Sequence, residues 1–598
     1  MSLPGSLWRM LTARQRRALI AMQLVSLAVA VSAVTGIAAI APFFAVLGEP
    51  GLIARNAWLR WLYHAGGFSS EHSLLVALGL AFIAIVLIAN LIGALGAWAM
   101  HRLALRIGTE LQTTLFDWYL SRPYAFHART ASTTLLNRVV YETTRVTYGV
   151  LENAFALVTS LVTAALIVVS IFIANAAAAL IVVGALAGGY ALIYLIVRER
   201  LLRSGQAQSR LAIEQARIAS ESFGAIKEIS VLRVESFFSA AFARASHELL
   251  RAAAHGRIVA ASPRHLMECV AAAGLVTLAL LLGAGAGGIG PWLGPLTFVA
   301  FAAYRLLPPL QQAFAALVRI RADRAALDLI GPDLRRAHSA RPHDAGGAGA
   351  DATWSEQPRR EIRLCGVWHR YDAARAFALR DVSLSIPARA TVGIVGANGS
   401  GKSTLVDLIA GLISPTRGAV LVDDRPLDDD NRAAWQARIA YVPQSIFLLD
   451  ASIAANIALG VAAVDERRLR EAARLAQLDE LLARLPHGYG ERIGERGVAL
   501  SGGERQRVGI ARALYRESAV LLLDEATAAL DSLTEQELVA TLARLHGRYT
   551  IVLIAHRMST VRACDVIFEL ESGTIAGCGS YERLLQCSQG FRQLAGVR

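Results

Sequence analysis

Six long apolar stretches divide the first half of the chain. Polar or charged segments separate most of them, and each has about the 20 residues that a helix needs to cross a bilayer. The predicted spans cover residues 18–47, 73–100, 150–174, 176–198, 267–291 and 293–317. We therefore expect a helical membrane domain of six spans over residues 1–330.

Charged residues beside these stretches predict the orientation of the spans. Arg14, Arg16 and Arg17 precede the first stretch, and Arg102 and Arg106 follow the second. Cytoplasmic loops of membrane proteins carry an excess of arginine and lysine. The pattern predicts a multi-pass protein of the cytoplasmic (inner) membrane with both termini in the cytoplasm.

An aromatic segment, residues 51–66, lies between the first two spans. It contains Trp58, Trp61 and Tyr63 among other apolar residues. Tryptophan and tyrosine concentrate where membrane meets water. The segment predicts a short interfacial helix, and an ordinary loop packed on the helix ends is the alternative.

Two long polar segments, residues 101–149 and 199–264, keep a helical spacing of apolar positions. We expect helices that continue beyond the membrane and reverse at turns near Ser121–Tyr124 and Ser222–Gly224. Residues 331–360 are rich in alanine, glycine, proline and charge, which predicts a flexible linker.

From Glu361 to the end, short apolar runs alternate with amphipathic helices, a pattern typical of an α/β domain over residues 361–598. Within it, Gly396-Ala-Asn-Gly-Ser-Gly-Lys-Ser-Thr404 follows the apolar run Thr391–Val395 and precedes an apolar helix. Strand, glycine-rich loop and helix is the context of a phosphate-binding loop, where backbone N–H groups and a helix N-terminus attract phosphate. The residues expected to bind ATP here are Gly396, Asn398, Gly399, Ser400, Gly401, Lys402, Ser403 and Thr404.

Individual roles follow from this chemistry. Lys402 would reach the β- and γ-phosphates, and Ser403 would ligate Mg²⁺. Downstream, the apolar run Val520–Leu523 ends in Asp524 and Glu525. Asp524 is expected to hold Mg²⁺ through water, and Glu525 is the candidate general base for the attacking water.

A third motif, Ser501, Gly502 and Gly503, opens another predicted helix. It is a second helix N-terminus able to bind phosphate, and a single site has no use for two that are so far apart in sequence. In a head-to-tail pair, the motif of each subunit could close on the γ-phosphate of the other. We therefore expect a second identical copy as partner, and a heterodimer with a related chain is the alternative.

In order and spacing, these motifs resemble the ATP-binding cassette family over nearly the whole of residues 361–598. The resemblance implies that Tyr371 stacks on adenine and that Gln444 reaches Mg²⁺ and the attacking water. It also implies that Asp531 contacts the opposite site and that His556 senses the γ-phosphate. The chain departs from the family pattern at one position, where Ala528 stands in place of a common serine.

The membrane half resembles the exporter type of this family. The resemblance implies a membrane all-α exporter domain joined to an α/β P-loop ATPase cassette, with ATP and Mg²⁺ as cofactors. It implies alternating access driven by ATP hydrolysis, with Glu525, Gln444 and His556 as catalytic residues. The turns near Pro123 and Gly224 would then be coupling segments.

Composition supports the membrane assignment. Hydrophobic residues make up 55% of the chain, mean hydropathy is +0.44 and only 18% of residues are charged, against about a quarter in soluble domains. The net charge of +13 sits largely beside apolar segments, which favours a membrane over a nucleic-acid partner. The five cysteines form no metal-like spacing and are expected to be free thiols.

Evidence on the cargo is a resemblance to flippases of lipid-linked oligosaccharides. The stretches that carry it are residues 51–66, Tyr124–His127 with Asn137, Ser262–Glu268 and Ala303–Pro309. A charged lipid pyrophosphate would need cationic groups in the membrane, so Arg305 and Arg264 are candidate substrate residues. For Arg305 the alternative is an arginine that is paired or extends to the cytoplasmic surface.

Other cargoes and other classes of protein also fit parts of the sequence. A lipid A-type or general lipid flippase and a multidrug exporter share the same architecture. A cytosolic cassette ATPase acting on nucleic acid would be released from membranes by high salt. An ATP-gated channel would conduct without stoichiometric hydrolysis.

Overall fold

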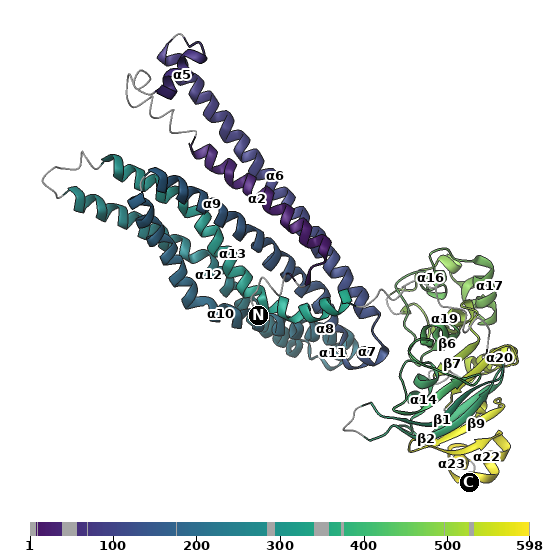
Figure 1. Cartoon of the computed structure of the whole chain (residues 1–598). Helices are drawn as coiled ribbons and strands as arrows, with labels where there is room; N and C mark the ends of the chain where they lie inside the picture. The colour runs from purple at the N-terminus through teal and green to yellow at the C-terminus, as the bar shows by residue number, and fades with distance from the viewer. Residues whose placement is uncertain are drawn as a thin grey trace. The chain divides into compact units, whose positions relative to one another are not determined.

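The computed structural model describes residues 8, 10–38, 57–68, 70–174, 176–283, 293–339, 358–371, 376–494, 497–524, 532–555 and 557–596. The chain divides into two compact units (Figure 1). The helical unit comprises Met1–Arg122 and His127–His343, and the α/β unit comprises Pro123–Phe126 and Asp344–Arg598.

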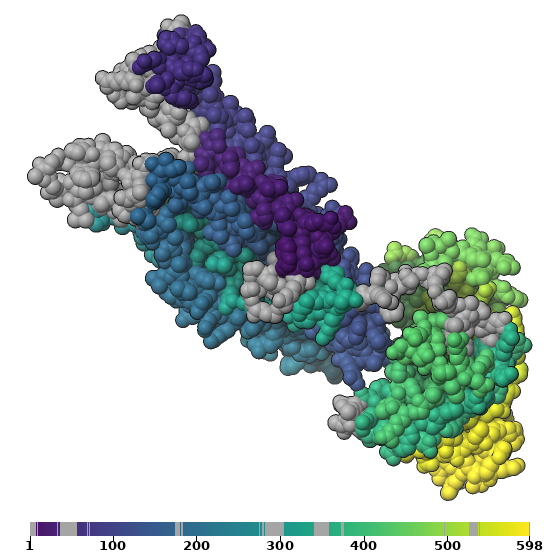
Figure 2. Space-filling view, viewed as in Figure 1, coloured from purple at the N-terminus to yellow at the C-terminus, as the bar shows by residue number. Residues whose placement is uncertain are grey.

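Long helices build the helical unit. They are α2 (Ala13–Ala38), α6 (Glu71–Leu120), α9 (Glu152–Ala174), α10 (Ala176–Gly224), α12 (Glu235–Gly283) and α13 (Leu293–Ser339). Each predicted span overlaps one of them, so the described part of every span is helical. Residues 39–47 of the first predicted span and 284–291 of the fifth lie outside the described residues. Helices α2 and α6 run side by side, and Figure 2 shows α2 on the surface of the unit. Among the described residues, His72–Leu120 and Ser132–Ile173 are long and apolar enough to cross a membrane.

Helices α6, α10 and α12 contain 50, 49 and 49 residues. At about 1.5 Å per residue each is roughly 75 Å long, more than twice the thickness of a bilayer's hydrocarbon core. Each helix thus runs without a break from a predicted span into a predicted polar extension. The position of these extensions beyond the membrane stays a prediction.

Short elements mark the predicted reversals. They are α7 (Tyr124–Arg129), α8 (Ser132–Leu136), the π-helical turns η1 (Asn137–Glu142) and η2 (Arg145–Leu151), and α11 (Ile226–Leu232). The aromatic segment contains a helix as predicted, α5 (Ala57–Ala65), in which Leu59 is buried and Trp58 and Trp61 are exposed. Its interfacial position stays a prediction, and residues 51–56 lie outside the described part.

Helix α13 corrects the predicted start of the linker, because it continues to Ser339. Leu334 is fully buried, and Asp333 accepts hydrogen bonds from the hydroxyl of Tyr119 (2.7 Å) and the guanidinium of Arg138 (2.9 Å). These contacts hold residues whose alanine-, proline- and charge-rich composition suggested a flexible segment. The remainder of the predicted linker, residues 340–357, lies outside the described residues.

The α/β unit contains two sheets, which confirms the predicted class. An antiparallel sheet has the order β2-β1-β4-β5, formed by β1 (Glu361–His369), β2 (Leu379–Pro387), β4 (Arg417–Val422) and β5 (Arg425–Pro426). The larger sheet has the order β10-β9-β3-β8-β7-β6 and is parallel except for β10. Its strands are β3 (Thr391–Gly396), β6 (Ile439–Val442), β7 (Val520–Asp524), β8 (Thr550–Ile554), β9 (Val566–Glu571) and β10 (Thr574–Gly579).

Helices pack on these sheets and bury the apolar strands on both faces, which is why β3 and β8 are continuous apolar runs. The helices that bear on the site are α14 (Lys402–Ile409) and α19 (Gly502–Tyr515). The others are α15 (Arg432–Gln436), α16 (Ile453–Ile457), α17 (Glu466–Leu475), α18 (Asp479–Arg484), η4 (Gly488–Gly490), α20 (Ser532–Leu545), α21 (Met558–Val561), α22 (Tyr581–Cys587) and α23 (Gln589–Leu594).

Candidate ATP site and membrane groove

The predicted phosphate loop connects β3 to α14. Gly401, the N-cap of α14, has a φ of 103°, and a Cβ there would lie 2.8 Å from the carbonyl oxygen of Ala378. A Cβ on Gly396 would lie 2.2 Å from the carbonyl oxygen of Leu570. Only glycine fits at both positions, so the sequence permits a tight loop that ends on a helix N-terminus.

Lys402 lies inside this loop. Its side chain is buried, and Nζ donates hydrogen bonds to the carbonyl oxygens of Gly396 and Ala397, each at 2.9 Å. These carbonyl groups are neutral, so a phosphate would be a stronger partner for the ammonium group. The role of Lys402 at the β- and γ-phosphates stays a prediction.

Tyr371 follows β1 and lies beside the phosphate loop. Its hydroxyl shares a hydrogen bond of 3.0 Å with the hydroxyl of Thr404 on α14. The side chain remains 45% exposed, which leaves ring surface for a ligand. Stacking on adenine stays a prediction, but the structure brings Tyr371 and the loop together.

The three predicted Mg²⁺ ligands come from neighbouring elements. Ser403 is on α14, Asp524 ends β7, and Gln444 lies two residues after β6. Strand β7 is paired with β6 and also contacts α14. Hydroxyl, carboxylate and amide oxygens are hard ligands of the kind that Mg²⁺ accepts, so these residues fit the ion.

Two further groups, which the sequence reasoning did not assign, surround Asp524. The hydroxyl of Tyr441 on β6 donates a hydrogen bond of 3.1 Å to Oδ2 of Asp524. Burial, and then the negative charge of Asp524, raise the pKa of Asp407 on α14 to about 6. Like charges this close favour a bound cation. A charged residue inside the apolar run Leu405–Leu412 was the available signal for Asp407.

The third predicted motif, Ser501–Gly503, lies at the start of α19. Ser501 caps the helix: its Oγ accepts from the backbone N–H of Glu504 (3.3 Å), and Glu504 accepts from the backbone N–H of Ser501 (2.7 Å). Glu504 also pairs with Arg484. Burial would raise the pKa of Glu504, but these hydrogen bonds outweigh it and lower the pKa. Ser501, Gly502 and Gly503 thus form a well-fixed helix N-terminus, and its contact with a second ATP stays a prediction.

Three predicted site residues, Glu525, Asp531 and His556, lie outside the described residues. Their neighbours in the sequence are described: Asp524 is the last residue of β7, and β8 ends at Ile554. The roles of the three residues stay predictions.

The predicted substrate residues lie on two helices that contact each other. Arg264 on α12 forms an ion pair of 2.9 Å with Glu268, and its side chain is 63% exposed. Arg305 on α13 is partly buried beside the buried Leu306. Their role in binding cargo stays a prediction.

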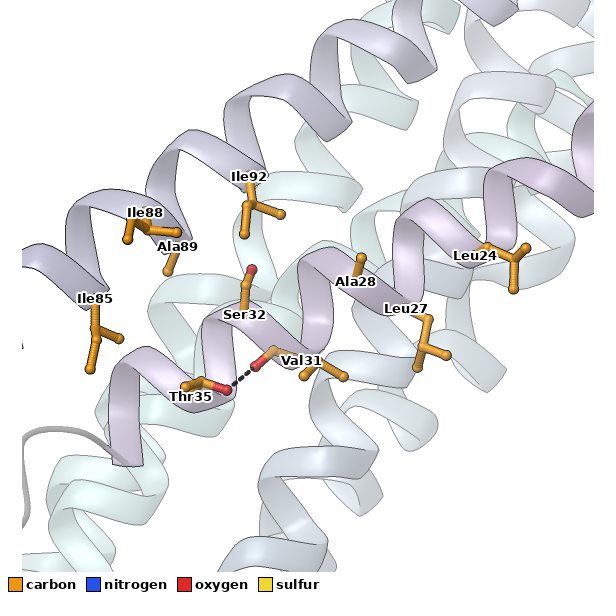
Figure 3. A pocket seen from close by; sticks show the side chains of 10 residues that line it. All are labelled: Leu24, Leu27, Ala28, Val31, Ser32, Thr35, Ile85, Ile88, Ala89 and Ile92. Atoms are coloured by element: carbon orange, nitrogen blue, oxygen red, sulfur yellow. Dashed lines mark hydrogen bonds between the residues drawn. The ribbon is translucent and has the colours of Figure 1, made fainter.

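An apolar groove of about 610 Å³ lies between α2 and α6 (Figure 3). Its two hydroxyl groups are satisfied inside α2, because Ser32 donates to the carbonyl of Val29 (2.8 Å) and Thr35 to that of Val31 (2.9 Å). Neither hydroxyl group needs a hydrogen bond from a ligand, so the groove suits a hydrocarbon chain. The lining residues are Leu24, Leu27, Ala28, Val31, Ser32, Thr35, Ile85, Ile88, Ala89 and Ile92.

Comparison with known proteins also finds a membrane region followed by an ATPase domain. Residues 38–318 match the family model of the ABC transporter transmembrane region, and residues 379–528 match a second family model described as ABC transporter. A relative from Cupriavidus metallidurans, an ATP-dependent lipid A-core flippase, is 30% identical over 84% of both chains. A protein of the same name from Chromohalobacter salexigens is 31% identical over 82% of this chain and 83% of its own length.

A solved structure shares the fold of both units. It is a bacterial Atm1-family ABC exporter with ATP bound, and the match has a TM-score of 0.75, 24% identity, and covers 97% of this chain and 98% of that one. Together with the site geometry, the relatives establish that the chain belongs to the ABC transporter family, as an ATP-hydrolysing half-transporter that carries a membrane region and an ATP-binding domain in one chain.

Proposed function

We propose that this chain is one half of an ATP-driven flippase, which works with a second identical copy to move a lipid across the cytoplasmic membrane. Both termini would lie in the cytoplasm, as the flanking arginines predict. The observation that carries the proposal is the apolar groove between α2 and α6, joined in one chain to an ATP site. Relatives named as lipid A-core flippases support a lipid cargo.

A lipid A-type molecule is the first candidate cargo, because the relatives carry that name. A lipid-linked oligosaccharide is the second. Helix α5 favours it, since Trp58 and Trp61 are exposed on a short amphipathic helix where a long lipid tail could pack. Both cargoes combine hydrocarbon chains with a phosphorylated saccharide head.

In this proposal, Arg264 and Arg305 would bind the phosphorylated head group of the lipid, and the groove between α2 and α6 would bind its hydrocarbon tail. A phosphate is costly in the membrane without a cation, and Arg264 and Arg305 are positioned on neighbouring helices of the helical unit. Arg264 is paired with Glu268, so a phosphate would have to displace a carboxylate. A guanidinium can bind either group with two parallel hydrogen bonds, which makes this exchange chemically reasonable.

Hydrolysis would follow the roles expected from the motifs. The phosphate loop with Lys402 binds ATP, and Ser403, Gln444 and Asp524 would hold Mg²⁺, which neutralises phosphate charge. Glu525 accepts a proton from the attacking water. His556 and Asp531 of one subunit, with Ser501–Gly503 of the other, would complete each of two sites.

The decisive experiment offers both lipids to the purified chain in proteoliposomes. Fluorescent lipid A and a fluorescent polyprenyl-pyrophosphate oligosaccharide are each tested for ATP-dependent movement between leaflets. The proposal expects movement of lipid A with wild type and none with Glu525→Gln. Movement of the polyprenyl lipid alone selects the second candidate, and failure of both lipids, or movement that persists in Glu525→Gln, contradicts the proposal.

Arginine variants test the head-group step in the same vesicles. Arg305→Ala and Arg264→Ala should slow movement of the phosphorylated lipid. Arg203→Ala is the control, since Arg203 is 80% exposed and only loosely paired with Glu199 at 3.7 Å. Equal rates of lipid movement in all three variants would show that Arg264 and Arg305 do not bind the head group. The proposal of ATP-driven lipid movement would still stand.

A further inference from the structure

Tyr441 occupies an unusual position beside the ATP site. Strand β6 runs parallel to β7, with Tyr441 opposite Leu522, and the other residues of β6 are buried. The side chain of Tyr441, in contrast, is 38% exposed and lies outside the core. Its hydroxyl reaches across to Asp524 and donates to Oδ2 at 3.1 Å.

The charges around this hydrogen bond fix its direction. An ionised carboxylate can only accept a hydrogen bond, so the phenol of Tyr441 is the donor and Oδ2 of Asp524 is the acceptor. Asp407 also acts on Asp524, and the two carboxylates repel each other. A donated hydrogen bond stabilises the charged carboxylate of Asp524 against this repulsion.

The bond also restrains geometry. A carboxylate at the end of a strand can rotate about its Cβ–Cγ bond, and a fixed donor on Oδ2 limits that rotation. Tyr441 is three residues before Gln444, so the same bond ties the strand that leads to one predicted Mg²⁺ ligand to the side chain of another.

We propose that Tyr441 is a positioning residue for ATP hydrolysis, whose hydroxyl orients the carboxylate of Asp524 for Mg²⁺ and links it to the strand that carries Gln444. In this proposal Tyr441 acts through Asp524 and needs no contact of its own with the nucleotide. The inference concerns the ATPase reaction and is independent of the cargo.

The test uses the full-length protein and the variant Tyr441→Phe, which removes one oxygen atom. Binding of a fluorescent non-hydrolysable ATP analogue is measured with Mg²⁺ and with EDTA. We expect affinity in EDTA to change by less than about twofold and the gain in affinity on adding Mg²⁺ to fall about 3- to 10-fold, the size expected for the net contribution of one hydrogen bond. The Mg²⁺ concentration that half-saturates ATP hydrolysis should rise by a similar factor.

Tyr515→Phe is the matched control. Tyr515 is a buried tyrosine of the same unit whose hydroxyl accepts a hydrogen bond of 3.0 Å from the backbone N–H of Asp465. Its loss should leave the Mg²⁺ response unchanged, because neither partner is a predicted ligand. A response to Tyr515→Phe as large as that to Tyr441→Phe would overturn the proposal.

A double substitution separates positioning from simple packing. If Tyr441 acts through Asp524, then Tyr441→Phe causes no additional loss of the Mg²⁺ response in an Asp524→Asn background. A further loss there refutes the inference. So does a single variant that responds to Mg²⁺ like wild type, or one that loses affinity equally in EDTA.

Discussion

Buried charge is handled differently in the two units. In the helical unit, Arg145 on η2 is 9% exposed and Glu142 on η1 is fully buried. The Arg145 guanidinium donates to Asp323 on α13 (2.8 Å), to Glu142 (3.0 Å) and to Ser209 on α10 (2.8 Å). Charged donor and charged acceptors satisfy each other within this Arg145 cluster.

At the ATP site of the α/β unit, charged side chains form hydrogen bonds with neutral groups. Lys402 donates to backbone carbonyl oxygens, and Asp524 accepts from the phenol of Tyr441 while Asp407 repels it. A bound phosphate would add a charged partner for Lys402, and a bound cation would add one for Asp524. We therefore expect the Arg145 cluster to hold the extensions of the helices together and the charges of the ATP site to act mainly on a ligand.

The largest effect should come from removing the positive charge of Lys402 at the ATP site. Lys402→Met keeps an unbranched side chain but removes the ammonium group, and ATP hydrolysis should fall by about 100-fold or more, as for other electrostatic stabilisers of a transition state. Its free energy of unfolding should stay close to that of wild type. A variant that keeps its ATPase rate, or that unfolds, would contradict the assignment.

The Arg145 cluster should show the opposite behaviour. Arg145→Leu leaves Glu142 and Asp323 without their buried cation, so we expect a loss of about 3–5 kcal/mol in the free energy of unfolding, measured by thermal or denaturant unfolding. Arg203→Leu, on the exposed surface of α10, should change it by no more than about 0.5 kcal/mol. Equal free energies of unfolding for the two variants would show that the Arg145 cluster does not stabilise the helical unit.

Close helix packing around the cluster gives a smaller effect. A Cβ on Gly205 would lie 1.8 Å from the backbone oxygen of Ala322, so Gly205→Ala must shift α10 against α13 at a cost of about 1–3 kcal/mol. Gly188, on the same helix, has open space around a Cβ, and Gly188→Ala should be neutral or slightly stabilising. Thermal unfolding of the two variants compares the effect of one added methyl group at a crowded position and at an open position of the same helix.

The smallest effect is expected at the end of α13. Tyr119→Phe removes the hydrogen bond to Asp333, which keeps its bond from Arg138. We expect a loss of about 0.5–1.5 kcal/mol. Tyr148→Phe, an exposed tyrosine, is the control and should leave the unfolding transition unchanged.

Local patterns sufficed for much of this account. The apolar spans, the glycines of the phosphate loop and the aspartate that ends β7 are signals within short windows, because lipid, phosphate and metal each demand a residue type at a fixed spacing. The Arg145 cluster was not predicted, since it joins positions 145, 209 and 323 on separate helices, and one sequence carries no sign of such a contact. The helical start of the predicted linker escaped for the same reason: Asp333 is held by Tyr119, far away in the sequence.

ATP-dependent movement of a lipid is the most direct test of the central claim. Wild type and Lys402→Met are reconstituted at equal density, and the fraction of fluorescent lipid A that changes leaflet is followed after ATP and Mg²⁺ are added. The account predicts movement with wild type that stops with Lys402→Met or on removal of Mg²⁺. Movement at the same rate in both proteins, or no movement in either, would contradict an ATP-driven lipid flippase.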